Sequence, residues 1–331
     1  MTLKKPKIYR DAQIDISILK ARRIAILGYG SQGRAQALNM RDTGIIPVIG
    51  LPARSKSRPK AKRDGFAVLT PPEAIANADL IAVLIPDHLQ GQLFSRQLKE
   101  SIRPGQTFIF AHGLAVHFGF VRQPRGVDFI MVAPHAPGIR LRERYLENKG
   151  VPAFIARTDE SSKGALKLAL AYGKAIGCAR AGLIRTTFAD EAIGDIFGEQ
   201  AVLCGGLAGL LKAGFGTLVE DGLSPYNAYL ECVYQLDLII DLIKRYGIDG
   251  MYERISLTAA YGGRLAENRM IGPDSRKAMR SLLADIKKGK FTRSMLDAGG
   301  RRLEDLKSRK SVKADKILDI MAHYFDRHFG D

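Results

Sequence analysis

The chain has few cysteines and no long apolar run, and each of these absences excludes a class of protein. Its three cysteines, Cys178, Cys204 and Cys232, lie in apolar helical contexts without metal-ligand spacing. We therefore expect buried thiols in a reducing cytoplasm rather than a disulfide framework. The longest apolar stretch, 201–211, contains glycines and is far shorter than the roughly 20 residues that span a membrane. The first residues, MTLKKPKIYRDAQ, lack the apolar core of a secretion signal, so we expect a cytoplasmic protein with no membrane partner.

Acidic residues are scarce relative to basic ones, which gives a formal net charge of +17. The segment Arg276 to Lys313 alone holds thirteen Lys or Arg residues against four Asp or Glu residues. Basic segments of this kind can bind nucleic acid, but this one lacks interleaved aromatic residues and its helical stretches are amphipathic. We expect a solvated basic surface that attracts phosphorylated or carboxylate ligands, and we keep nucleic-acid binding as the alternative.

The order of the predicted elements divides the 331 residues into two domains. Strand and helix patterns alternate as far as residue 187, which is typical of a doubly wound parallel sheet. From residue 188 onward the strand patterns stop and long helical patterns follow. We therefore predict a Rossmann-type α/β domain over 1–187 and an all-α domain over 188–331.

A glycine motif follows the first apolar strand pattern, at 24–27. The motif reads G-Y-G-S-Q-G over 28–33, then a helical stretch ends at Gly44 and a second strand follows. This is the context that a dinucleotide fingerprint requires. Gly28 permits the tight turn, Gly30 lets the backbone approach a pyrophosphate, and Gly33 allows close helix–strand packing. The helix then presents its N-terminal N–H groups to the phosphates.

No carboxylate occurs between Asp42 and Asp64, where an NAD site usually places one to hold the ribose hydroxyls. The loop at 50–58 instead offers three cations and two hydroxyls, from Arg54, Lys56, Arg58, Ser55 and Ser57. These groups suit a 2′-phosphate dianion, because charge-assisted hydrogen bonds recognise it. The sequence therefore predicts NADP(H), with an exposed basic loop as the alternative.

Polar residues follow the later strand patterns, at the strand ends where ligands bind in such sheets. They are Asp87-His88, His112-Gly113 and the run 134–138, which contains His135. A single histidine is usually structural or faces solvent. Two histidines, His112 and His135, at successive strand ends beside a nicotinamide site indicate a catalytic role.

Two predicted helices, at 190–213 and 225–246, each carry a pair of polar side chains four residues apart. The pairs are Asp195 with Glu199, and Glu231 with Gln235. Four residues are about one helical turn, so each pair projects from one face. Carboxylates arranged in this way suit a hard cation such as Mg²⁺, and a solvated helix face is the alternative. Both helices are apolar around much of their circumference, which predicts deep burial or a helical dimer interface.

Taken in order, GYGSQGRAQALN, GL…SKS, AHGLAVHFG, MVAPHAPG, TTF…DIFGEQAVLCGG and ECVYQLDLI resemble the short form of ketol-acid reductoisomerase. The resemblance runs to about residue 290. It implies an NADPH- and Mg²⁺-dependent oxidoreductase of branched-chain amino-acid biosynthesis. Such an enzyme moves an alkyl group within an acetohydroxy acid and then reduces the resulting 2-keto acid. The resemblance further implies a knotted C-terminal helical domain and a homodimer, or a higher even oligomer, whose two subunits complete the metal site.

The resemblance also assigns roles to single residues. The cofactor-binding positions that it implies are Tyr29 to Gln32 (Tyr29, Gly30, Ser31, Gln32), Ser55, Ser57, the segment Asp87 to Gln90 (with His88 and Gln90), and Gly138. The other positions are His112 as the active-site histidine, Asp195, Glu199 and Glu231 as metal ligands, and Ser256 as a substrate contact.

The chain departs from the family pattern at several of these positions. His135 replaces a lysine of the network around the metals, and Gln235 replaces the fourth carboxylate. Pro52 replaces an arginine of the phosphate loop, where Arg54 or Arg58 could compensate. Two further departures are His88, where the family often has Glu or Thr, and Ala115-Val116, where it has Asn-Ile.

These departures affect alkyl migration more than cofactor binding, because migration needs two metals and a base. His135 could act as an acid or a ligand. The main hypothesis is a ketol-acid reductoisomerase that acts on acetohydroxy acids or related 2-keto acids. The alternatives are a paralogue that only reduces a 2-keto acid, a metal-free hydroxy-acid dehydrogenase, and a non-catalytic NADP-binding protein.

Overall fold

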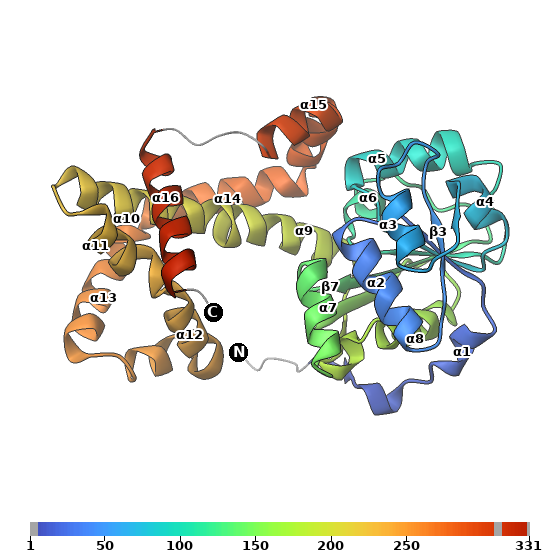
Figure 1. Cartoon of the computed structure of the whole chain (residues 1–331), viewed down its shortest axis with the longest axis horizontal. Coiled ribbons are helices and arrows are strands. Elements are labelled where there is room, and N and C mark those ends of the chain that lie inside the picture. The colour runs from blue at the N-terminus through green and yellow to red at the C-terminus, as the bar shows by residue number, and fades with distance from the viewer. Residues whose placement is uncertain (1–5, 308–312, 330–331) are drawn as a thin grey trace. The chain divides into compact units, whose positions relative to one another are not determined.

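Figure 1 shows the computed structural model of the chain, which describes residues 6–307 and 313–329. The chain forms two compact units, Met1–Gly194 and Asp195–Asp331. The first unit contains the strands and the second is helical (Figure 1). The unit boundary falls inside one helix, α9 (Phe188–Gly198), at Gly194.

Among the described residues, the first unit is built on one sheet of nine strands in the order β1-β9-β8-β7-β6-β5-β2-β3-β4. The strands are β1 (Ile8–Tyr9), β2 (Ile24–Leu27), β3 (Val48–Gly50), β4 (Val68–Leu69), β5 (Leu80–Val83), β6 (Thr107–Phe110), β7 (Asp128–Pro134), β8 (Ala153–Arg157) and β9 (Leu183–Arg185). The predicted strand at 24–27 and the strand predicted after Gly44 are confirmed as β2 and β3, and the predicted alternation of strands and helices as far as residue 187 is confirmed as well. The short edge strands β1 and β4 were not predicted.

Helices cover both faces of this sheet (Figure 1). They are α1 (Ser17–Lys20), α2 (Ser31–Asp42), α3 (Arg58–Arg63), α4 (Pro71–Ala76), α5 (Asp87–Gln92), α6 (Leu114–His117), α7 (Gly138–Leu146) and α8 (Ala165–Ala175), with the 3-10 turns η1 (Asp11–Gln13) and η3 (Cys178–Arg180) and the π-helix η2 (Leu93–Leu98).

The two faces of the sheet have separate apolar cores. In β2, Ile24 and Ile26 pack with α2 and α8, whereas Ala25 and Leu27 pack with α4 and η2. This division follows from the geometry of a β-strand, in which successive side chains point to opposite faces of the sheet. A strand that is buried on both faces has a continuous apolar sequence, as β2 and β5 do.

The sheet is not parallel throughout, which corrects the sequence prediction. It is parallel from β4 across to β7, but β7 and β8 pair antiparallel, with Ala153 opposite Pro134. The chain reverses directly after α7 at Asn148, whose φ is 56°, so β8 starts at the edge where β7 ends. An alternation of strand and helix patterns predicts a crossover but does not encode this reversal.

The second unit is made of helices among its described residues. They are the end of α9, the π-helices η4 (Glu199–Leu203) and η5 (Leu230–Tyr234), and α10 (Gly205–Glu220), α11 (Pro225–Tyr229), α12 (Leu236–Tyr252), α13 (Leu257–Met270), α14 (Pro273–Lys287), α15 (Lys290–Lys307) and α16 (Lys313–Phe329). Ser224 caps α11 by accepting from the Asn227 N–H, and α11 begins at Pro225, where the sequence predicted a helix start. Gly247 breaks α12 with a φ of 76°, where the sequence predicted a helix end.

A small core holds α10, α11 and α16 together around Phe215, Tyr229 and Phe325. Outside it many large apolar side chains are exposed. Of the three cysteines only Cys178 is buried, and Cys204 is exposed, so the prediction of three buried thiols is wrong. The reason is that the apolar face at the start of α10 is uncovered within one chain.

The continuous helical stretch Phe188–Glu220 is long and apolar enough to cross a membrane by length and composition, with a mean hydropathy of 1.6 over 18 residues. This stretch includes the uninterrupted apolar run 201–211 and extends it with polar and charged residues. A single such helix is weak support for membrane insertion, because an apolar helix that packs against another chain has the same composition. The basic segment after Arg276 forms most of α14 and α15, and its residues 308–312 lie outside the described residues.

Candidate active site

The glycine fingerprint has the geometry of a phosphate-binding turn. Gly28 has a φ of +101°, and a Cβ there would lie 2.4 Å from the Leu84 carbonyl oxygen. A Cβ on Gly33 would lie 2.4 Å from the Gly28 carbonyl oxygen. By contrast, Gly30 caps α2 and has open space where its Cβ would be. The first and third glycines therefore allow packing, and the second leaves the helix N-terminus accessible to a ligand.

Helix α7 meets α2 at this turn. A Cβ on Gly138 would lie 2.2 Å from the Ser31 carbonyl oxygen, so the two helix N-termini touch. The Gln32 side-chain amide donates to the Ala136 carbonyl oxygen at 2.8 Å and accepts from Gln36. Two sequence-predicted cofactor positions, Gln32 and Gly138, thus lie together and fix α7 against the fingerprint.

Tyr29 of the fingerprint is fixed by a carboxylate that the sequence did not single out. The Tyr29 hydroxyl donates to Asp64 at 2.8 Å, and the Arg34 guanidinium donates to both oxygens of the same carboxylate at 2.7 and 3.2 Å. The Arg34 hydrogen bond is the main reason why the pKa of Asp64 is lowered. Asp64 directly follows α3, so it ties the fingerprint to the helix that follows the predicted phosphate loop.

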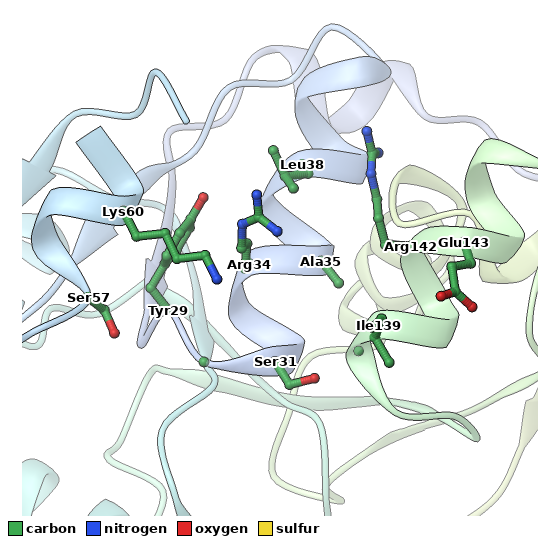
Figure 2. Close-up of a pocket in the computed structure, with 12 residues that line it drawn as sticks. Tyr29, Ser31, Arg34, Ala35, Leu38, Ser57, Lys60, Ile139, Arg142 and Glu143 are labelled. Carbon is green, nitrogen blue, oxygen red and sulfur yellow. The ribbon is translucent and has the colours of Figure 1, made fainter. Parts of the chain in front are cut away.

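A pocket of about 430 Å³ lies over the start of α2, between α3 and α7. Figure 2 shows Lys60 of α3, Arg34 of α2 and Arg142 of α7 around it, together with Ser31 and Ser57. Three cations, two hydroxyls and a helix N-terminus therefore surround one space. This arrangement favours a phosphorylated ligand. We call it the α2 pocket.

The predicted phosphate-loop residues differ in their availability to a ligand. Ser57 lines the α2 pocket, and its backbone N–H donates to the Ser55 hydroxyl at 3.3 Å. The Arg54 side chain is exposed. The Arg58 guanidinium donates to the carbonyl oxygens of the strand ends at Leu51, Val68 and Leu69. Arg58 thus holds β3 and β4 together, whereas Lys60, which the sequence analysis did not name, lies in the pocket.

A second hollow, of about 170 Å³, lies at the carboxyl ends of β2, β3 and β5. Its walls are apolar and include Leu27, Pro52, Ile85 and Leu89. Pro52 is the residue that replaces an arginine of the family pattern, and it contributes apolar surface here. A flat aromatic group fits a wall of this composition better than a charged group does.

His112 and Glu191 form a pair at the end of β6. The His112 Nδ1 lies 3.0 and 3.1 Å from the two carboxylate oxygens of Glu191, and the Gly113 backbone N–H donates to that carboxylate at 2.6 Å. Glu191 is 4% exposed. A buried carboxylate with two such partners fixes the orientation and the tautomer of the imidazole ring.

The charges of His112 and Glu191 influence the nearby Asp87 carboxyl. Burial raises the pKa of the Asp87 carboxyl, and Glu191 raises it further, against the opposing effect of His112. The Gln90 amide donates to Asp87 at 3.0 Å and to the Ile85 carbonyl at 3.2 Å. The Gln90 Oε1 is buried without a hydrogen-bond partner among the described residues. His88, next to Asp87, is half-buried. An unsatisfied buried acceptor of this kind is suited to a ligand's N–H group.

His135 occupies a different environment from His112. Its ring packs edge-on against Phe154 with centroids 4.4 Å apart, and its side chain is exposed. Its backbone N–H donates to the Pro152 carbonyl oxygen and so continues the β7–β8 pairing. The structure thus places His135 at the strand end, as the sequence predicted, against an aromatic ring.

The two predicted metal-ligand pairs lie on helices that widen to π geometry at the pairs themselves. Glu199 begins η4, and Gln235 follows η5, which contains Glu231. In the part of the chain that the structure describes, no three His, Cys, Asp or Glu side chains form a metal-binding group, so Asp195 and Glu199 do not cluster with Glu231. Gln235 donates to the Leu230 carbonyl oxygen at 3.2 Å, and Ser256 caps α13 by accepting from the Ala259 N–H.

Two protein-family models match this chain. A family model described as "Acetohydroxy acid isomeroreductase, NADPH-binding domain" matches residues 18–182. A second, "Ketol-acid reductoisomerase, C-terminal domain", matches residues 188–320. The chain belongs to the ketol-acid reductoisomerase family. It therefore belongs to a family of oxidoreductases, and the resemblance in its motifs is confirmed.

Relatives cover almost the whole chain. A ketol-acid reductoisomerase (NADP(+)) from Methanococcus maripaludis is 43% identical over 313 residues, which are 95% of each chain. One from Campylobacter hominis is 44% identical over 289 residues, which are 87% of this chain and 85% of that one. The solved structure of an NADH-preferring ketol-acid reductoisomerase from an uncultured archean is 38% identical, with a TM-score of 0.91 over 98% of this chain and 100% of that one.

Within this family assignment, the structure adds Glu191, Asp64 and Lys60 to the residues of the candidate site. Glu191 carried a signal that the sequence analysis did not use. It precedes Asp195 by four residues, as Asp195 precedes Glu199, so the three acids repeat at one helical turn. Asp64 and Lys60 carried no such signal, because only the fold brings α3 to the fingerprint.

Proposed function

We propose that this chain is an NADPH- and Mg²⁺-dependent ketol-acid reductoisomerase that acts on acetohydroxy acids or related 2-keto acids in branched-chain amino-acid biosynthesis. The observation that carries the proposal is the joint presence, in one unit, of a cationic pocket after β2 and a buried Glu191–His112 pair after β6 of the same sheet. Redox chemistry needs the first, and proton transfer beside it needs the second.

The cofactor is expected to bind across the first unit. Its pyrophosphate meets the N-terminus of α2 at Gly30 and Ser31, and its adenine enters the hollow at Pro52. The 2′-phosphate meets Ser57 and Lys60. Membership in this family does not determine whether the cofactor is NADH or NADPH, since the archean relative is described as NADH-preferring. Ser57 and Lys60, which line the α2 pocket, and the lack of a carboxylate between Asp42 and Asp64 support NADPH.

His112 is the group that transfers a proton to or from the substrate. Glu191 accepts the Nδ1 proton and holds the ring, so Nε2 is the atom that exchanges a proton with the substrate oxygen. The nearby Asp87 keeps its own proton more readily than an ordinary aspartate, because burial raises its pKa. The unsatisfied Gln90 Oε1 suits the carboxamide N–H of a nicotinamide ring.

The donor set suits Mg²⁺ in chemistry but is incomplete in one chain. Asp195 and Glu199 offer carboxylate oxygens, which hard cations prefer. When bound, the ion polarises the substrate oxygens. Because these two do not cluster with Glu231 within one chain, we infer that Glu231 and Gln235 are supplied by a second copy in a homodimer or higher even oligomer. The unpaired cysteines support a reducing, cytoplasmic location.

Two observations favour a second candidate, a reductase that has lost alkyl migration. The Gln235 side chain is neutral and bonds to its own helix, and His135 packs against Phe154 where the family has a lysine. Gln235 removes one unit of the negative charge that holds a second metal, and His135 lacks the ammonium group that the family places in the network around the metals. Hydride transfer to a 2-keto acid requires only one metal ion, since one cation can polarise one carbonyl.

The deciding experiment is NADPH oxidation with 2-acetolactate and, separately, with 3-hydroxy-3-methyl-2-oxobutyrate, each with Mg²⁺ and with a chelator. Mg²⁺-dependent turnover of both substrates is the expected result. Turnover of the second alone would identify the reductase. Turnover that a chelator leaves unchanged would identify a metal-free dehydrogenase, and silence on both substrates would contradict the proposal.

A further inference from the structure

A pocket of about 360 Å³ lies in the first unit, away from the fingerprint and the phosphate loop. Its walls come from the end of α5, the π-helix η2 and the segment 119–124 that follows α6. The volume is within the range of small-molecule sites, roughly 300–1,000 Å³. It shares no lining residue with the α2 pocket or with the hollow at Pro52. We call it the π-helix pocket.

The walls of the π-helix pocket combine an apolar floor with cations at the rim. Phe94 is buried and belongs to an aromatic cluster with Phe108, Phe110 and Phe129. Phe120 and Ile102 complete the apolar part. Two exposed cations, Lys99 and Arg122, also line the pocket.

The charge at this rim is not neutralised. Neither Lys99 nor Arg122 has an ion pair or a side-chain hydrogen bond among the described residues. The two wall segments, 91–103 and 119–125, contain five Lys or Arg residues against one acid, Glu100. An apolar floor with a cationic rim selects a ligand that has an apolar body and an anionic end.

The walls are connected to the candidate active site through their own elements. Helix α5 starts at Asp87 and continues into η2, and α6 follows His112 and leads into 119–124. The two walls also touch, since a Cβ on Gly91 would lie 3.0 Å from the Phe120 carbonyl oxygen. A π-helix is a costly irregularity that often occurs at functional sites. A ligand between these walls would therefore act on the spacing of Asp87 and His112.

We propose that the π-helix pocket binds a small organic carboxylate with an aromatic or branched apolar body, and that its occupancy alters the neighbouring cofactor site. Phe94, Phe120 and Ile102 hold the apolar body, and Lys99 and Arg122 hold the carboxylate. The binding step is independent of the proposed function, and only the coupling step rests on it.

The test is calorimetric titration of the full chain with 2-naphthoate, with and without saturating NADPH. Saturable binding is expected, with a dissociation constant that rises by roughly tenfold or more in Lys99→Glu and in Arg122→Glu, the size of a lost charge-assisted bond. Ser95→Phe, which places a ring in the pocket, should also abolish binding. Arg125→Glu is the matched control, because it changes the same charge on an exposed residue outside the lining.

Absence of saturable binding, or equal binding in all four variants, would overturn the pocket assignment. The neutral analogue 2-naphthamide should bind more weakly than the carboxylate, and equal affinity would overturn the role of the cations. For the coupling, the NADPH dissociation constant should change with naphthoate in the wild type and not in Ser95→Phe. An NADPH affinity that ignores naphthoate would refute the coupling, whereas failure of NADPH to bind at all would count against the proposed function instead.

Discussion

At the scale of single residues, the buried Glu191 carboxylate is the main determinant of the His112 geometry. Glu191→Gln keeps an acceptor for the Gly113 N–H but removes the charge that stabilises a protonated imidazole. We expect kcat to fall on the order of 100-fold, the typical contribution of a positioned acid or base, with the KM for NADPH nearly unchanged. Steady-state kinetics with varied NADPH and substrate check this. Glu220→Gln, the same change on an exposed residue, is the control, and equal losses in both would contradict the assignment.

Asp87 provides a prediction about pH at the same scale. Because burial raises its pKa, the folded state holds the proton more tightly than the unfolded state, and the contribution of Asp87 to stability falls as pH rises above its usual value of 3.8. Asp87→Asn should therefore gain stability relative to the wild type between pH 4 and pH 7, measured by urea unfolding. Asp79→Asn should show the opposite sign at lower pH: it should lose stability relative to the wild type as pH rises up to the usual value of 3.8, because the Arg23 hydrogen bond lowers the pKa of Asp79. Parallel trends would contradict the signs.

At the scale of elements, α3 links the phosphate loop to the fingerprint through Asp64 and presents Lys60 to the α2 pocket. Lys60→Glu should raise the KM for NADPH roughly tenfold while leaving that for NADH nearly unchanged, because only NADPH carries the 2′-phosphate. Lys62→Glu is the matched control, since Lys62 is exposed on the same helix and does not line the pocket. Equal effects of the two variants would mean that the general charge of α3, rather than Lys60, attracts the cofactor.

The elements also show which features a sequence can predict. The strands β2 and β5 were predictable because a strand buried on both faces must be apolar throughout. The cap at Ser224 and the break at Gly247 were predictable because they are local. The π-helices η4 and η5, in contrast, have the side-chain pattern of ordinary helices. Whether such a segment widens to a π-helix depends on tertiary packing. For the same reason the contact of Asp64 with Tyr29, across 35 residues, left no local pattern.

At the scale of the whole molecule, the exposed apolar surface of the second unit indicates what a single chain leaves incomplete. On α13, Leu257, Tyr261 and Leu265 are 90%, 73% and 66% exposed, and they recur every four residues on one helix face. In the same unit, Val202, Leu203 and Leu210 are 53%, 67% and 54% exposed. Patches of this kind mark interfaces with other chains. A second copy that covers them would also bring a second set of Glu231 and Gln235, which the proposed metal site requires.

One charged residue on the exposed face of α13 should separate the subunits. Burying a leucine contributes about 1.5–3 kcal/mol. An isologous contact contains it twice, so Leu265→Asp should raise the dimer dissociation constant by roughly 100-fold or more. Sedimentation velocity at micromolar concentration measures this as a shift toward the monomer. Leu146→Asp is the matched control, because Leu146 is 65% exposed, almost the same as Leu265, but lies in the first unit. A Leu265→Asp protein that sediments like the Leu146→Asp protein would place the interface elsewhere. If Leu265→Asp is monomeric and still turns over with Mg²⁺, the metal site does not need the second copy.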